Sequence, residues 1–279
     1  MLNLSEALAT GLVAFREAFE AILLSTIIIM LLKKMGEHGK IKIVYTTAIL
    51  SVVLGVALGA GIYTIFRGFP EKELVEAGMS YLAAMVIGTV IVWGVRHGPK
   101  IKGEIEAKLA SSLSAKAVAV VTFIFVFREV FETVLITAPF LVSNPSSNIL
   151  GVSGGTLGAL ALGVAVYWLG MRINLRTFFL GTSILLAFVA SGLVGYGTHE
   201  LLEWFEEEGI KLGVLGKKIQ LLNVGENSLL HPKNAIGGLL SVMVGYYHYM
   251  EIARIILQGS TLLLLLAYII AAYKPFGKF

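Results

Sequence analysis

The stretch FREAFEAIL, Phe15–Leu23, places one arginine and two glutamates in the middle of an otherwise apolar run. A second stretch, FREVFETVL, Phe127–Leu135, carries the same three charged residues at the same positions, 112 residues later (127 − 15 = 112). Charged side chains are rare inside long apolar segments, and those that occur there are functional candidates by default. The repetition therefore indicates that both stretches serve a common purpose.

The composition is that of an integral membrane protein. Of the 279 residues, 57% are hydrophobic and 14% are charged, whereas soluble domains have roughly 25% charged residues. A hydrocarbon core about 30 Å thick needs about 20 mostly apolar residues per spanning helix. We therefore predict an all-α integral membrane protein with seven transmembrane helices, near residues 4–32, 41–66, 74–95, 115–142, 150–171, 177–204 and 246–273.

Two residue types are missing from the sequence, and their absence limits the chemistry. Without cysteine the chain has no disulfides, no thiolate metal sites and no sulfur nucleophile. Without aspartate, every side-chain carboxylate belongs to a glutamate. The formal net charge is +4, but the basic residues lie at the ends of the apolar runs. We therefore expect no nucleic-acid partner.

The distribution of lysine and arginine predicts the orientation. Thirteen of these residues fall in the segments after the first, third, fifth and seventh runs, and six fall on the opposite side. Because cytoplasmic loops are enriched in positive charge, the N-terminus is expected outside and the C-terminus in the cytoplasm of a multi-pass cell-membrane protein. Most glutamates between the runs fall on the outer side, where negative charge concentrates cations.

The paired motifs predict an inverted repeat. The fourth run comes three spans after the first. Because each span reverses the direction of the chain, these two helices are antiparallel. In such transporters the substrate site lies near mid-membrane, where the repeats meet. We treat 1–279 as a single transmembrane transporter domain, with repeat one at about 1–110, repeat two at about 111–205, an external segment at about 206–234 and a last helix at about 235–279.

Helical geometry places the charged residues of each motif on one face. At about 100° per residue, Arg16 lies roughly 40° from Glu20, and Glu17 lies roughly 60° from it. Four glutamates and two arginines sum to −2, whereas a network that only fixed packing would favour equal numbers of each sign. Protons or a multivalent cation must balance the excess. Four converging carboxylates form a hard, oxygen-only site that suits iron, manganese, magnesium or calcium.

The segments REAFE (Arg16–Glu20) and REVFE (Arg128–Glu132) resemble the R-E-x-x-E motif of the oxidase-dependent iron transporter family, the iron permeases of fungi and bacteria. The glycine-rich stretch AIGGLLSVMVGYYHYMEIARIILQ, residues 235–258, is similar to the family's approach to its last helix. The resemblance implies an iron permease. It also implies that Glu17, Glu20, Glu129 and Glu132 are iron ligands and that Arg16 and Arg128 position them.

Two further groups are candidate accessory residues. His199 and Glu203 are i, i+4 neighbours near the end of the sixth run, and Glu200 lies beside them, so this group is a candidate metal site at the outer mouth. It is also consistent with a polar membrane anchor. In the last run, His248 and Glu251 are at i, i+3 spacing, and Glu251 is expected either to serve the transport path or to pair with Arg254.

Transport into the cytoplasm is the leading hypothesis, with iron as substrate and no cofactor beyond the transported metal. One alternative is a transporter of another hard divalent cation such as manganese. Another is a membrane-embedded di-metal oxidase, although both motifs lack the Glu-x-x-His pattern of di-iron bundles. Candidate partners are the lipid bilayer, an external iron-oxidising or iron-delivering protein and a second copy of the chain.

Overall fold

The apolar runs form long α-helices in the computed structural model of the chain, which describes residues 4–110, 114–169, 174–210, 212–221, 228, 237, 240–241 and 244–273. The α-helices are α1 (Leu4–Lys34), α2 (Ile41–Phe66), α3 (Lys72–His97), α4 (Ile101–Ala110), α5 (Ala115–Ser143), α6 (Pro145–Leu169), α7 (Leu175–Glu207) and α9 (Ile252–Tyr273). Short 3-10 turns, η1 (His38–Lys40) and η2 (Gly98–Lys100), precede α2 and α4, and the strands are β1 (Lys218–Gln220) and β2 (Tyr249–Glu251).

Local sequence sets several helix ends. The Ser114 side chain accepts a hydrogen bond from the Ala117 N–H and caps the start of α5. The Asn174 side chain accepts hydrogen bonds from two backbone N–H groups at the start of α7. Such caps satisfy donors that have no partner within the helix. Pro145 is the first residue of α6, a position that needs no N–H donor.

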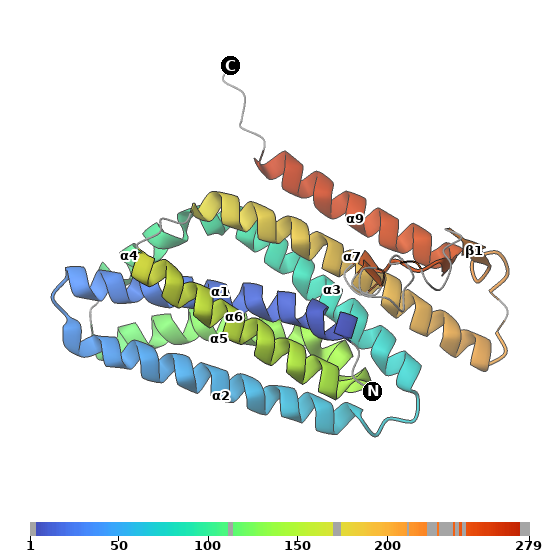
Figure 1. Ribbon diagram of the computed structural model, residues 1–279, viewed down its shortest axis with the longest axis horizontal. Coiled ribbons are helices and arrows are strands. Elements are labelled where there is room, and N and C mark those ends of the chain that lie inside the picture. Colours follow the sequence, from blue (N-terminus) through green and yellow to red (C-terminus); the bar gives the residue numbers. More distant parts are fainter. Residues whose placement is uncertain are drawn as a thin grey trace, which may run out of the picture.

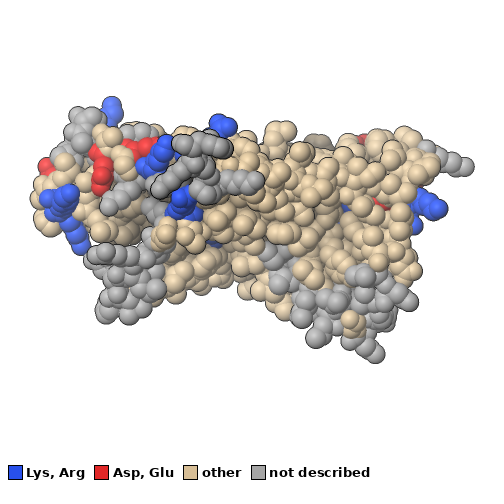
Figure 2. All heavy atoms as spheres, turned by 90° about the horizontal axis from the view of Figure 1, so that it is seen from above, with Lys and Arg blue, Asp and Glu red and all other residues tan. Residues whose placement is uncertain are grey.

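Within the described residues, five segments are long and apolar enough to cross a membrane: 38–66, 72–97, 145–165, 176–207 and 252–273. The all-helical membrane-protein class predicted from the sequence is thus confirmed. The two other long helices, α1 with 31 residues and α5 with 29, are the ones that carry the repeated charged motifs. On the face seen in Figure 2, most of the coloured charged side chains lie toward the two ends of the long axis.

The helices pack in pairs along the long axis (Figure 1). Helix α1 packs against α6, and α2 packs against α5. Helix α3 packs against α7, which also contacts α9. Helix α5 contacts α1 and α3 as well, and so connects the two groups. The charged motifs therefore lie on adjacent helices.

Small residues bring α6 close to α1. A Cβ atom added to Gly155 would lie 2.9 Å from the Phe15 nitrogen and still closer to the Gly11 carbonyl oxygen. A Cβ at Gly163 would lie 2.7 Å from Cγ2 of Ile22. By contrast, nothing lies within 4 Å of a Cβ built on Gly154. The helix backbones thus approach closely along one stripe of α6.

Helix α2 uses a similar stripe toward α5. Four of its buried residues recur every four positions, at Thr47, Ser51, Gly55 and Gly59. A Cβ on Gly55 would overlap Cγ1 of Val130, which directly follows the second motif's first glutamate. The close packing of α2 therefore positions the motif segment of α5.

Two hydrophobic clusters flank the charged motifs. One is built mainly on α3, α7 and α9, around Ile87, Leu193 and Ile269, and also includes Val13 of α1 and Ile136 of α5. The other joins α1, α2, α4 and α5 and includes Leu32, Ile105 and Val118. The motif residues lie between these clusters along α1 and α5, so their side chains are held in a rigid, apolar surrounding.

The predicted last helix is wrong at its start. We expected it at about 235–279, with the span near 246–273, but α9 begins at Ile252. Residues Tyr249–Glu251 form β2 instead and pair antiparallel with β1, with Glu251 opposite Lys218. Gly245 has φ +66°, a left-handed conformation that ends helices and favours glycine. Of the predicted external segment at about 206–234, residues 206–210, 212–221 and 228 are described, and the remainder lies outside the described residues.

Candidate metal site

The helical spacing of each motif places its three charged side chains inside the protein. On α1, Arg16, Glu17 and Glu20 are all buried. On α5, Glu129 and Glu132 are buried, whereas the side chain of Arg128 is 23% exposed. The equivalent side chain of Arg16 is 3% exposed. The two motifs thus differ in how their arginines are enclosed.

Each arginine pairs with the glutamates of its own motif. Arg16 Nη1 lies 2.5 Å from Glu17 Oε2, and Arg16 Nη2 lies 2.6 Å from Glu20 Oε1. Arg128 Nε lies 2.6 Å from Glu132 Oε1. Arg16 Nη1 also reaches to 4.0 Å from Glu132 Oε2. The last contact joins the two motifs across the α1–α5 interface.

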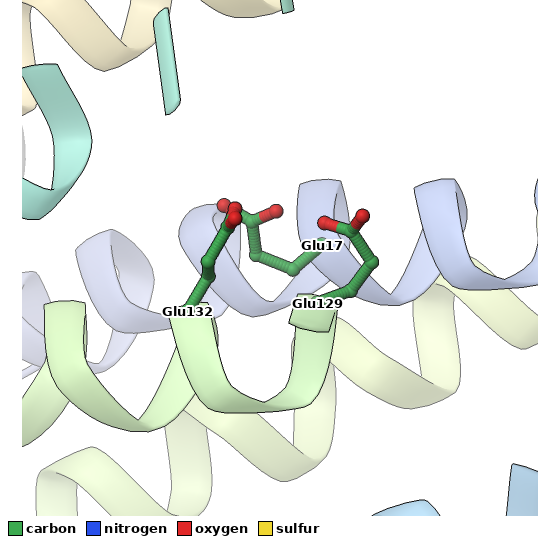
Figure 3. A group of neighbouring side chains, drawn as sticks. All are labelled: Glu17, Glu129 and Glu132. Atoms are coloured by element: carbon green, nitrogen blue, oxygen red, sulfur yellow. The ribbon is translucent and has the colours of Figure 1, made fainter. Parts of the chain in front are cut away.

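Three of the four predicted ligands come together. One oxygen from each of Glu17, Glu129 and Glu132 can be chosen so that all three atoms lie within 4.8 Å of one another. Figure 3 shows Glu17 projecting from α1 toward the two glutamates of α5. Glu20 lies outside this group and is held by Arg16. The structure thus assembles a carboxylate cluster from both motifs.

The cluster keeps oxygen atoms that the described part of the protein does not satisfy. Oε1 of Glu17, both oxygens of Glu129 and Oε2 of Glu132 are buried without a hydrogen-bond partner among the described residues. Leaving buried carboxylate oxygens unpaired is unfavourable unless a cation or proton compensates. Four glutamates and two arginines leave a formal charge of −2, so the cluster has the charge and the ligand type for a hard divalent cation.

Sequence analysis missed Trp93 of α3 as a part of this region. The guanidinium carbon of Arg128 lies 3.4 Å from the centroid of the Trp93 ring, well within the distance of a cation–π contact. Trp93 stacks in turn on His97, with ring centroids 5.5 Å apart. The R-E-x-x-E pattern carries no signal for a partner on a different helix, so this contact required the tertiary structure.

The fold brings the predicted accessory residues at the end of α7 next to Glu251, which is a predicted accessory residue of the C-terminal segment. Nδ1 of His199 lies 3.1 Å from Glu251 Oε1, and its Nε2 lies 3.8 Å from Glu203 Oε2. Lys218 Nζ lies 3.8 Å from the same Glu251 oxygen. His199 is therefore placed between two carboxylates, one on its own helix and one on β2.

The expectation that His248 and Glu251 lie one turn apart on a helix is wrong. Glu251 lies in β2, and His248 lies before it in a bend, with its ring against that of Tyr249. The ion pairs of Glu251 are with His199 and Lys218, whereas the guanidinium of Arg254 lies over the Tyr247 ring. A strand directs neighbouring side chains differently from a helix, and the i, i+3 argument fails here.

The environment of Glu251 stabilises its charged form. Burial by itself raises the pKa of a carboxyl group. The hydrogen bond with His199, a backbone hydrogen bond and the positive charges of His199 and Arg254 outweigh burial and lower the pKa of Glu251 to about 2. Glu251 thus remains ionised over the physiological range and ties β2 to α7.

A second contact joins the start of α3 to the end of α7. The Tyr196 hydroxyl donates a hydrogen bond to Glu76, which is buried in α3. Glu200, the third predicted accessory residue on α7, interacts with the same hydroxyl group. Carboxylates therefore gather where the first turns of α3 meet the last turns of α7, away from the central cluster.

The comparisons with known proteins agree with this picture. The Iron permease FTR1 family matches residues 7–271 of the chain. An uncharacterized protein of Archaeoglobus fulgidus is 38% identical over 263 residues, covering 94% of each chain. The protein named Ferrous iron permease EfeU from Yersinia pestis is 27% identical over 243 residues, covering 84% of this chain and 83% of its own. The EfeU of an Escherichia coli strain is 26% identical over 256 residues, covering 88% of each chain. No solved structure gives a significant match.

The fold defines a multi-pass helical membrane protein with buried carboxylates contributed by two helices. The chain belongs to the Iron permease FTR1 family. The resemblance drawn from the paired motifs is confirmed, and membership in a family of permeases supports iron transport rather than an enzymatic reaction.

Proposed function

We propose that the protein carries iron into the cytoplasm through a mid-membrane site formed by the motif glutamates, with ferrous iron as the transported form. The observation that carries this proposal is the convergence of Glu17 with Glu129 and Glu132, whose unsatisfied oxygens point to a cation as the missing partner. The names of the EfeU relatives support the ferrous form.

Glu20 is the fourth ligand in this proposal. Its carboxylate is bound to Arg16, and Arg16 also contacts Glu17 and reaches toward Glu132. A divalent cation in the cluster competes with Arg16 for the same carboxylates, because both are positive and close. Displacement of the guanidinium frees Glu20 to turn toward the ion. Arg16 and Arg128 thus balance part of the charge while the site holds no cation.

We further propose that α1 and α5 also cross the membrane, which gives seven spans and two inverted repeats, at about 1–110 and about 111–205. Arg16 and the four motif glutamates are buried, so these charges do not meet lipid. Two packing contacts support the repeat. Gly59 of α2 lies near Val134 of α5, and Gly163 of α6 contacts Ile22 of α1. Val134 and Ile22 each follow their motif arginine by six residues (134 − 128 = 22 − 16 = 6).

The proposed orientation places the N-terminus outside, in keeping with the excess of lysine and arginine on the other side. The outer ends of α3 and α7 then carry Glu76, Glu200 and Glu203, and β2 adds Glu251. Negative charge at this end raises the local concentration of cations before they reach the central cluster.

Uptake of radioactive ferrous iron into proteoliposomes tests the proposal. We expect Glu132→Gln and Glu20→Gln to reduce the initial rate by about tenfold or more, because each variant removes a carboxylate that the proposal assigns to the cation. Glu37→Gln is the matched control, since Glu37 lies at the surface in the segment before α2 and pairs with Lys40. Unchanged uptake in both motif variants, with normal folding, would remove these glutamates from the mechanism.

A further inference from the structure

A groove of about 770 Å³ lies beside the carboxylate cluster, between α3, α5 and α9. Its lining includes Thr89, Val92, Trp93 and His97 of α3 and Arg128 and Glu132 of α5. Those from α3 recur at three- and four-residue steps and thus share one helix face. Glu132 belongs to both the groove and the cluster.

The groove extends along the half of α3 that ends in positive charge. Glu132 lies near the middle of α5, whereas Arg96 and His97 are the last two residues of α3 and are followed closely by Lys100. In the proposed orientation this basic end faces the cytoplasm. The groove thus connects mid-membrane depth with the cytoplasmic side.

The groove contains charged groups that hydrocarbon solvates poorly. The Arg128 side chain is 23% exposed and lines the groove together with Glu132. An arginine facing lipid near mid-membrane is costly, and such residues instead face a protein interior or a water-filled cavity. Its counterpart Arg16 is almost fully enclosed. This difference between the motifs indicates that water reaches the second motif.

Arg128 joins Glu132 of the cluster to Trp93 of the groove wall. Its Nε is 2.6 Å from Glu132, and its guanidinium carbon is 3.4 Å from the centroid of Trp93. A cation leaving Glu132 along the groove therefore passes the Arg128–Trp93 contact. Positive charge on Arg128 opposes that passage until the side chain moves.

His97 lies beyond this contact and has the form of a metal ligand. Its Nδ1 is 3.3 Å from the Trp93 carbonyl oxygen, so the tautomer that donates from Nδ1 leaves the Nε2 lone pair available. Metal-binding histidines commonly donate the other ring N–H to a backbone carbonyl in this way. His97 also lines the groove.

We propose that the groove is a water-filled exit route to the cytoplasm, gated by the contact of Arg128 with Trp93, and that His97 is the first ligand of the cation beyond this gate. The inference rests on the proposed transport of a cation and adds its route, its gate and a release site. The chemistry of the route suits a divalent cation such as ferrous iron.

Single cysteines test whether the groove holds water, because the natural sequence contains none. Thr89→Cys and Val92→Cys place thiols in the groove, and Ile124→Cys places one on α5 one turn from Arg128, at an exposed position outside the groove lining. We expect a membrane-impermeant thiosulfonate added from the cytoplasmic side to label the groove thiols about tenfold faster, since a thiol in lipid rarely ionises. Equal rates at all three positions would mean that lipid fills the groove, and would overturn the proposal.

This labelling needs no transport, so its failure is distinct from a failure of the uptake assay. Two variants then test the gate in vesicles preloaded with ferrous iron. Trp93→Ala removes the aromatic face and is expected to speed iron exit to the cytoplasmic side by roughly three- to tenfold. Trp93→Phe retains an aromatic face and is expected to change exit less. Equal exit rates in wild type and Trp93→Ala would refute the gate.

The role of His97 is tested by separating binding from turnover. We expect His97→Ala to reduce the rate of iron release by about tenfold, with the equilibrium affinity of the central cluster for ferrous iron unchanged. His38→Ala, a change in the η1 turn outside the groove, is the matched control. An unchanged release rate, or an equal loss in both variants, would exclude His97 as a release ligand.

Discussion

The close packing of α6 on α1 makes a sharp prediction for two adjacent glycines. Gly155→Ala adds a methyl group that would lie 2.9 Å from the Phe15 nitrogen and closer still to the Gly11 carbonyl. Gly154→Ala adds the same methyl group where nothing lies within 4 Å. The two substitutions share their chemistry and differ only in the helix face.

The two substitutions are expected to change the stability of the protein in opposite directions. Backbone atoms cannot give way as a flexible side chain does, so Gly155→Ala must push the helices apart, and overpacking of this kind costs about 1–3 kcal/mol. Alanine gains up to about 1 kcal/mol over glycine in a helix, and that gain applies to both variants. We therefore expect Gly155→Ala to be less stable than Gly154→Ala by about 1–3 kcal/mol.

The change is measurable as a shift in apparent melting temperature in detergent, followed by circular dichroism at a fixed scan rate. At about 2–4 °C per kcal/mol for a chain of this size, Gly155→Ala is expected to melt roughly 2–12 °C below Gly154→Ala. The Gly155 variant should also bind ferrous iron more weakly, because displacement of α1 moves Glu17 away from Glu129 and Glu132. Equal melting temperatures for the two variants would refute the described α1–α6 interface.

Three other predictions follow from single contacts. Glu129→Gln relieves repulsion between carboxylates whose oxygens lie within 4.8 Å of one another. This repulsion is about 3.5 kcal/mol per charged pair at an effective dielectric constant of about 20, before protons or cations offset it. We expect the variant to have a higher melting temperature without metal and a smaller rise in melting temperature on adding ferrous iron, and the reverse pattern would contradict the cluster. The pKa of Glu251 falls from 4.5 to about 2 on folding, so its stabilising effect is complete above pH 4.5 and is lost as the pH falls toward 2. The melting-temperature difference between wild type and Glu251→Gln should shrink over that pH range, and a constant difference would argue against the contact with His199. Gly245→Ala forces a side chain into φ +66° and places its Cβ 2.8 Å from the Gln258 amide; we expect a loss of at least about 1 kcal/mol in thermal unfolding, and no loss would argue against this turn.

Much of the fold was predictable because a membrane helix is recognisable from the hydropathy of its own residues. The helices from Ile41 to Phe66 and from Lys72 to His97 begin and end close to their predicted bounds. The prediction failed at the start of the last helix, where an apolar run continues but the chain forms β2. Hydropathy does not distinguish a strand from a helix over a few residues, and the antiparallel partner of β2 lies about 30 residues away in sequence.

The candidate site was predictable to a similar extent. Helical periodicity alone placed Arg16, Glu17 and Glu20 on one face, and the salt bridge of Arg16 with Glu20 follows from i, i+4 spacing. The spacing did not reveal that Glu17, rather than Glu20, joins the carboxylates of α5. That outcome depends on the rotation of α1 relative to α5, which the small residues of α2 and α6 set by packing against them.

The amino-acid sequence by itself determined the membrane class, the two charged motifs and the oxygen-only character of the site, because these properties depend on residue type and on periodicity within one helix. The tertiary structure decided which three carboxylates meet, that Arg128 rests on Trp93, and that His199 contacts Glu251. Those contacts join helices and strands far apart in the chain. They depend on how closely and at what rotation the helices pack, which local sequence patterns do not encode.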